Sequence, residues 1–272
     1  MAAIDVVGAH WSTDDLAGLT VVVTGGTRGV GRGIVEAYLA VGCSVYVGSR
    51  NAPSEEDRPS VQRLDGSTAQ ATYMAVDVRD AEQIGWLVEL AVGDTGRLDV
   101  WINNAGGAPS ADAATASPRF SQSIINLNLM AALFGATAAN TVMQTQESGG
   151  LIINIASVSG LRPSPLTAAY GAAKAGLMNL TESLAAEWGP KVRVNGIAAG
   201  MLDTGAASDH FGGDEGVARI AATVPLKRLG TPHDIAGVCL LLSSPLASYI
   251  SGANLVVHGG GEWPAFHHAM KA

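Results

Sequence analysis

Three side chains in the segment NIASVSGLRPSPLTAAYGAAK could together move a proton to or from a substrate. Tyr170 and Lys174 are four residues apart in a run typical of a helix, so their phenol and ammonium share one face. A cation beside a phenol favours the phenolate and lowers its pKa from about 10, which makes the tyrosine usable near neutrality. Ser157 closes the preceding apolar run, where its hydroxyl could polarise a carbonyl. Taken alone, a Tyr-x-x-x-Lys pair also fits an ordinary pair on a helix surface. The rest of the chain decides between this interpretation and a catalytic pair.

A glycine-rich turn, GGTRGVG, follows the first apolar run, LTVVVT, and leads into a helical stretch. Glycine lets the backbone turn tightly and approach a ligand that a side chain would exclude. The free N–H groups and positive dipole end of the following helix suit a pyrophosphate. The turn therefore predicts a dinucleotide site at the first strand. Its expected cofactor-binding residues are Thr24, Gly25, Thr27, Arg28, Gly29, Val30 and Gly31.

The next strand, CSVYVGSR, ends at Ser49 and Arg50, where this fold meets the adenosine ribose. An acidic residue there favours NAD, whereas arginine accommodates the 2′-phosphate of NADP. No acid stands at this strand end, and Arg28 offers a second guanidinium, which matches phosphate well. We therefore expect NADP(H) to be preferred, with NAD(H) possible. The alternative is that both arginines are merely solvated.

Composition limits the other classes. Of 272 residues, 47% are apolar and 15% charged, which suits a parallel sheet covered on both faces and also an oligomer. The net charge of −8 argues against a nucleic-acid surface. We expect Cys43 and Cys239 to be buried free thiols in a reducing compartment. No signal peptide, membrane-spanning run or metal-ligand set is evident, which predicts a soluble cytoplasmic protein with no nucleic-acid or membrane partner.

Strand-like and helix-like runs alternate throughout, which predicts a single Rossmann-like domain with a doubly wound parallel sheet of about seven strands. We expect helices over about 80–93, 117–143 and 231–243, and a loop with a short helix over 52–70. Within 117–143, Asn126 is expected to be a satisfied core amide. The expected organisation is an extension over 1–18, the domain over 19–261 with a mobile lid near 201–225, and a tail over 262–272 that packs on a neighbour or edges the pocket.

Together these residues resemble the short-chain dehydrogenase/reductase family, in its single-domain branch with a TGxxxGxG turn. The similarity covers nearly all of residues 18–261. It includes the strand end Asp77–Val78, the NNAG run at 103–106, NLNL with Asn128, and the later runs RVNGI, LKRLGTPHDIA and YISGANLVVHGGG. The family implies a Rossmann-like fold, commonly a homotetramer, and the use of NAD(H) or NADP(H).

The resemblance also implies roles. Tyr170 is the general acid for carbonyl reduction or the base for alcohol oxidation, and Lys174 holds the nicotinamide ribose and lowers the pKa of the tyrosine. Ser157 steadies the substrate oxygen, and Asn128 holds a water in the proton relay. The further residues expected around the cofactor are Asp77, Val78, Asn103, Asn104, Ala105, Gly106, Ile197, Gly200 and Thr204.

Two positions depart from the family pattern. Ala199 replaces the proline of the usual Pro-Gly beside the nicotinamide, which frees one torsion and restores an N–H. His258 replaces the usual aspartate near the last strand, and we expect it to serve packing or a subunit contact.

The sequence thus predicts an NADP(H)-dependent oxidoreductase acting on a ketone, a 3-oxoacyl-type compound or a secondary alcohol. A cofactor-binding redox sensor or scaffold, and an epimerase or dehydratase, are the alternatives. Arg162 lies where a substrate anion could be met, although a solvated loop arginine fits equally well. Met201, Leu202 and Phe211 suggest a mostly apolar ligand.

Overall fold

A seven-stranded parallel sheet forms the centre of the computed structural model, which describes residues 4–6, 9–63, 66–205, 212–263, 266 and 270. The strand order is β11-β10-β9-β8-β3-β4-β7, so the chain reverses its winding direction between β3 and β8. This confirms the predicted doubly wound sheet. The strands are β3 (Thr20–Thr24), β4 (Ser44–Ser49), β7 (Thr72–Ala75), β8 (Val100–Asn103), β9 (Gly150–Ser157), β10 (Val192–Ala199) and β11 (Asn254–Val257).

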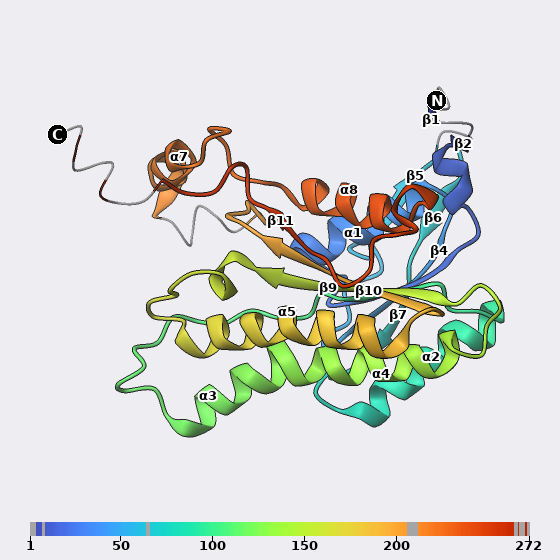
Figure 1. Cartoon of the computed structure of the whole chain (residues 1–272), viewed down its shortest axis with the longest axis horizontal. Coiled ribbons are helices and arrows are strands. Elements are labelled where there is room, and N and C mark those ends of the chain that lie inside the picture. The colour runs from blue at the N-terminus through green and yellow to red at the C-terminus, as the bar shows by residue number, and fades with distance from the viewer. Residues whose placement is uncertain are drawn as a thin grey trace.

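Helices cover both faces of the sheet, as Figure 1 shows. One layer holds α1 (Gly29–Ala40) and α8 (Pro232–Ser243), and the other holds α2 (Ala81–Thr95), α4 (Ala131–Met143) and α5 (Ala168–Trp188). Strand β3 is buried along its whole length. Val21 and Val23 pack into the first layer and Val22 into the second, because successive side chains of a strand point to opposite faces.

The predicted helix over 117–143 is present, but it is not uniform. It consists of α3 (Pro118–Ile125), a π-helical turn η2 (Asn126–Met130) and α4. By length and composition Pro118–Met143 could cross a membrane. Its α4 half instead packs on the sheet beside α2 and buries Ala136, Ala139 and Met143, as a core helix does.

The prediction of a short helix within 52–70 was wrong. This segment contains an antiparallel hairpin of β5 (Ser60–Gln62) and β6 (Thr68–Gln70). Val61 and Ala69 are its inward-facing apolar residues, and they join the core layer of α1. With only one such residue per strand, period-2 burial is hard to see in the sequence.

The expected N-terminal extension and the expected lid both contain regular secondary structure. Strands β1 (Ile4–Val6) and β2 (Ala9–Trp11) pair antiparallel, and the 3₁₀ turn η1 (Thr13–Leu16) inserts Leu16 into the core with 1% of its surface exposed. The expected lid region contains helix α7 (Gly213–Thr223). Residues 206–211, which include Phe211, lie outside the described part of the chain.

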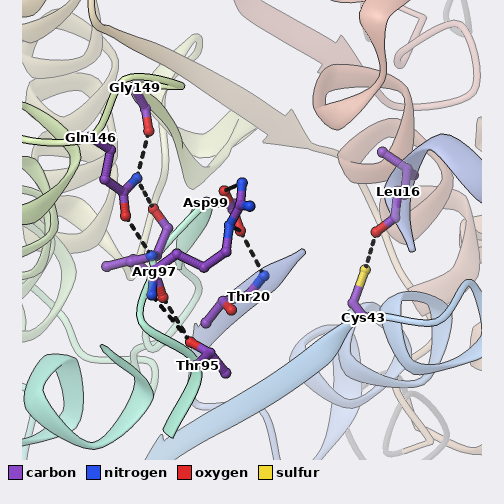
Figure 2. A network of polar contacts seen from close by, with 9 residues as sticks. Leu16, Thr20, Cys43, Thr95, Arg97, Asp99, Gln146 and Gly149 are labelled. Atoms are coloured by element: carbon purple, nitrogen blue, oxygen red, sulfur yellow. Dashed lines mark hydrogen bonds and ion pairs between the residues drawn. The ribbon is translucent and has the colours of Figure 1, made fainter. Parts of the chain in front are cut away.

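A polar network ties the start of β3 to the segment before β8 (Figure 2). Asp99 is buried, accepts a hydrogen bond from the Thr20 backbone N–H at 2.8 Å and pairs with Arg97 at 2.6 Å. Gln146 closes the same edge through hydrogen bonds to both backbone groups of Leu98. Cys43 lies nearby and donates to the Leu16 carbonyl. As predicted, Cys43 and Cys239 are free and buried.

Candidate active site

The ends of β3 and β8 meet where the sheet reverses its winding direction, and this is where a doubly wound sheet binds its ligand. Thr24 Oγ1 accepts hydrogen bonds from the backbone N–H groups of Asn104 at 3.0 Å and Ala105 at 3.1 Å. The Asn104 side chain in turn donates to the carbonyls of Thr24 at 2.9 Å and Gly25 at 3.0 Å. The two predicted turns are therefore fastened directly to each other.

The glycines of the first turn leave a bare cradle. Gly25 and Gly29 adopt left-handed backbone angles, with φ of 66° and 53°. A Cβ at Gly31 would collide with the Gly25 carbonyl and the Asn104 amide, and one at Gly29 would lie 3.4 Å from Thr204 Cβ. The N-cap residue Arg28 makes no side-chain capping bond, so the first N–H groups of α1 remain available to a ligand. Such a cradle at a helix N-terminus fits a pyrophosphate.

The expected adenosine end carries two exposed arginines, Arg28 and Arg50. Neither makes an ion pair with another described residue. Ser49 instead bonds the Asn51 carbonyl. The Asp77 carboxylate is held by Arg79, and this hydrogen bond lowers the pKa of Asp77.

Asn128 is buried in the π-helical turn and holds the backbone of the second glycine turn. Its Oδ1 accepts from the Gly107 N–H at 2.8 Å, and its Nδ2 donates to the Gly107 carbonyl at 3.0 Å and to the Ile124 carbonyl at 2.9 Å. The expected core amide Asn126 was placed wrongly, because it is only half-buried and bonds Gln122 at the surface.

Ser157, Tyr170 and Lys174 come together from the end of β9 and the first turns of α5. The Lys174 ammonium lies 5.6 Å from the centre of the Tyr170 ring and donates to the Ile155 carbonyl at 2.7 Å. A side-chain hydrogen bond joins Ser157 to Tyr170. A Cβ at Gly106 would lie 3.4 Å from Lys174 Nζ, so Lys174 borders the second glycine turn.

The electrostatics differ from the expectation that the lysine lowers the pKa of the tyrosine. Burial raises the pKa of Tyr170, and the hydrogen bond from Ser157 opposes that rise. Burial also lowers the pKa of Lys174 to about 8, because it disfavours the charged ammonium. In the protein alone, desolvation therefore outweighs the attraction between the two groups.

Two glycines that sequence reasoning overlooked bring Ser157 and Tyr170 together. The turn η3 (Val158–Gly160) follows Ser157 and packs directly on α5. A Cβ at Gly160 would lie 2.6 Å from the Ala175 backbone nitrogen, and one at Gly171 would lie 2.8 Å from the Ser159 carbonyl oxygen. Any side chain at these positions would push the serine away from the helix. In the sequence, the signals for this close approach are two glycines. They are Gly160 in the run SVSG and Gly171 directly after Tyr170.

A cavity of about 530 Å³ lies beside this group. Val158, which directly follows Ser157, forms part of its lining. The other apolar side chains around it are Leu161, Met201, Val224 and Trp263, and the glycines are Gly200, Gly260 and Gly261. Its polar residues are Arg162, His258 and Glu262. Of the residues expected to contact an apolar ligand, Met201 lines this cavity, whereas Leu202 lines a smaller one next to it.

Two of the polar residues, Arg162 and His258, were singled out in the sequence. Arg162 is an exposed loop arginine, and its Nη2 pairs with Glu262 Oε1 at 2.6 Å, so its guanidinium is already occupied by a carboxylate of this chain. His258 packs under Gly200, where a Cβ would lie 2.6 Å from His258 Cβ, and it also faces the cavity. Glu262 and Trp263 were missed as individual cavity residues, although the tail was expected to edge the pocket.

Fold and site together define a class of protein that binds a dinucleotide at the switch point of a doubly wound sheet and carries a proton-handling tyrosine beside it. A family model described as enoyl-(acyl carrier protein) reductase matches residues 25–262. The chain belongs to the short-chain dehydrogenase/reductase family of oxidoreductases.

Relatives of the chain span several activities. It is 34% identical over 248 residues to 3beta-hydroxysteroid dehydrogenase 1 of Eggerthella lenta, covering 91% of this chain and 95% of that one. It is also 34% identical to the 3-oxoacyl-[acyl-carrier-protein] reductase FabG of Chlamydia muridarum, covering 88% and 95%. Aldohexose dehydrogenase from Thermoplasma acidophilum superposes with a TM-score of 0.82 at 26% identity, covering 91% and 95%.

Proposed function

We propose that the protein is an NADP(H)-dependent oxidoreductase that transfers hydride between nicotinamide and a ketone, a 3-oxoacyl-type compound or a secondary alcohol. The observation that carries this proposal is the grouping of Ser157, Tyr170 and Lys174 beside the glycine cradle. The relatives named above act on steroid, acyl and sugar compounds by their names, which supports a carbonyl or alcohol group as the reacting centre. The proposed setting is a cytoplasmic homotetramer.

When bound, the nicotinamide supplies or accepts the hydride, and the protein handles the proton and the charge on oxygen. Thr24, Gly25, Thr27, Gly29, Val30 and Gly31 are proposed to hold the pyrophosphate end, and Arg28, Ser49 and Arg50 the adenosine end. Asp77, Val78, Asn104, Ala105, Gly106, Gly200 and Thr204 are proposed to line the rest of the crevice.

Ser157 and Tyr170 are the hydroxyl donors on which the growing negative charge of a substrate oxygen would be stabilised. Tyr170 then gives its proton to that oxygen in reduction, or removes it in oxidation. Lys174 brings a buried cation to the same place and is proposed to contact the cofactor ribose. Asn128 keeps the loop at Gly107 in position and is proposed to hold a water of the proton relay.

The phenol supplies the first test of this function. Replacing Tyr170 with Phe keeps the ring but removes the proton, so kcat for reduction of a ketone panel should fall by about 10²–10⁴-fold. NADPH binding, measured by fluorescence titration, should stay within about twofold. Equal turnover by the two proteins would rule out the tyrosine as the acid, and absence of turnover by the wild-type protein would favour a sensor or scaffold.

The cofactor preference rests on Arg28 and Arg50, which are exposed and without an ion-pair partner among the described residues. Replacing both arginines with Ala should raise the Kd for NADPH by about tenfold or more and leave that for NADH within about twofold, because only NADPH carries the 2′-phosphate. Isothermal titration with both cofactors measures this. A parallel loss for the two cofactors would contradict the assignment.

A further inference from the structure

An ion pair closes one side of the cavity beside the catalytic group. Arg162 lies on the loop between η3 and α5, and Glu262 lies 100 positions later, after the last strand. Resting on the proposed function, we propose that this pair makes the site selective for uncharged, predominantly apolar ketones and alcohols. A substrate that carries a carboxylate or phosphate at its far end would be disfavoured.

The walls of the cavity favour an apolar body. Val158, Leu161, Met201, Val224 and Trp263 present hydrocarbon and aromatic surface to it. The volume of about 530 Å³ falls in the range of pockets that bury a drug-sized ligand. A ligand that fills it would remove this apolar surface from water, which is the main favourable contribution to binding.

The charged lining residues neutralise each other. Among the described residues that line this cavity, Arg162 is the only lysine or arginine, and its guanidinium already donates to Glu262 at 2.6 Å. A substrate anion would have to displace that carboxylate and would then lie next to it. Arg162 freed of its partner would attract an anion, so the glutamate rather than the arginine determines the preference.

The backbone, and not the ion pair alone, brings Glu262 to this place. Gly259, Gly260 and Gly261 all have left-handed backbone angles, with φ of 65°, 98° and 83°. The Gly259 carbonyl accepts from the Leu226 N–H at 3.1 Å, and a Cβ at Gly260 would press on Pro225 at 2.9 Å. This glycine segment is therefore seated against the chain between α7 and α8. An exposed ion pair is weak by itself, and the seated segment keeps the carboxylate close.

The test compares two matched ketones, benzylacetone and its para-carboxylate, 4-(3-oxobutyl)benzoate. Wild-type protein should reduce benzylacetone with a kcat/KM at least about fivefold higher. Glu262→Gln should raise the relative kcat/KM for the carboxylate by about fivefold, because it frees the guanidinium. The double variant Arg162→Glu with Glu262→Arg should restore the wild-type preference. Glu147→Gln removes an exposed negative charge elsewhere, and it should leave the ratio unchanged.

Two kinetic outcomes would overturn the proposal. One is a wild-type preference for the carboxylate, and the other is a ratio in Glu262→Gln that equals the ratio in Glu147→Gln.

A binding measurement separates this inference from the proposed function. In Tyr170→Phe protein with NADPH present, calorimetric titration should give tighter binding of benzylacetone than of the carboxylate. Adding Glu262→Gln should narrow that gap. This result would support the cavity assignment even if no ketone is turned over. Equal binding of both compounds, or binding of neither, would overturn it.

Discussion

Lys174 carries a positive charge into the interior of the protein, where it is surrounded by the end of β9, the second glycine turn and the tyrosine ring. Only 4% of its surface is exposed, and its one hydrogen bond goes to the Ile155 carbonyl. Burial of a charge in this way costs stability. The residue proposed to act in the site is thus also one that destabilises the fold.

The pKa of Lys174 predicts how stability depends on pH. The folded pKa of about 8 lies below the ordinary value of 10.5, so the unfolded chain holds the proton more tightly. The destabilisation is complete below pH 8 and disappears as the pH rises towards 10.5. The free energy of unfolding of the wild type, relative to Lys174→Met, should therefore increase by about 3 kcal/mol across this window. Urea titrations at several pH values measure it.

The exposed Lys191→Met variant is the control, since its difference from the wild type should stay flat over the same window. A flat difference for Lys174→Met as well would contradict the desolvation argument.

The grouping of the candidate catalytic residues was predictable from the sequence, because helical spacing places Tyr170 and Lys174 on one face. Their environment was not. Whether burial or the neighbouring charge dominates depends on which groups surround the pair in three dimensions. The link between Arg162 and Glu262 was hidden for the same reason, since it joins residues far apart in the chain.

Among the elements, the π-helical turn at Asn126–Met130 shows how a local irregularity places a functional group. A π-turn adds a residue to one helical turn, and such turns are frequent at functional sites. Here it places the Asn128 amide against Gly107 while Ile124 stays buried in the core. Periodicity predicted a helix over this stretch but could not reveal where the helical phase shifts.

The two asparagines of this turn form a matched pair for mutation. Asn128→Ala removes both bonds to Gly107 and the bond to the Ile124 carbonyl, so it should destabilise the fold by about 1–3 kcal/mol and raise the KM for the cofactor. Asn126→Ala removes only a surface bond to Gln122 and should change stability by no more than about 0.5 kcal/mol. Thermal unfolding with and without NADPH measures both. Equal effects would contradict the anchoring role of Asn128.

Over the whole molecule, the stabilising polar network and the candidate active site lie at opposite ends of the strands. The cofactor cradle and Ser157 lie at the carboxyl ends of the strands. The network of Thr20, Arg97 and Asp99 lies where β3 and β8 begin (Figure 2). In a parallel sheet the beginnings and the carboxyl ends of the strands lie on opposite sides of the molecule. A substitution at one end therefore need not affect the other.

Asp99→Ala should therefore destabilise the protein without changing its chemistry. The Thr20 N–H and the Arg97 guanidinium lose their buried acceptor, which should cost about 2 kcal/mol. Asp99→Asn keeps an acceptor for Thr20 and should cost less. Urea unfolding gives the stability, and kcat and KM at 25 °C should stay within about twofold. A large change in KM would show that the two ends of the strands are coupled.

Much of this architecture was predictable because buried parallel strands are continuous apolar runs that alternate with helices. The seven strands, their parallel arrangement and the two glycine turns follow from those patterns. The hairpin of β5 and β6 could not be predicted from such patterns, since its strands are short and mostly polar. Helix α7 was also missed, because a glycine-rich, charged segment is equally typical of a loop.

The π-turn also limits how the length of this chain can change. Removing one residue from Asn126–Met130 would turn the π-turn into regular α-helix and change the position of the Asn128 amide relative to Gly107. An insertion there would instead rotate α3 by about 100° relative to α4 and take Ile124 out of its place in the core. Either change of length would therefore disturb the site or the core, whereas Asn126 can lose its side chain at little cost.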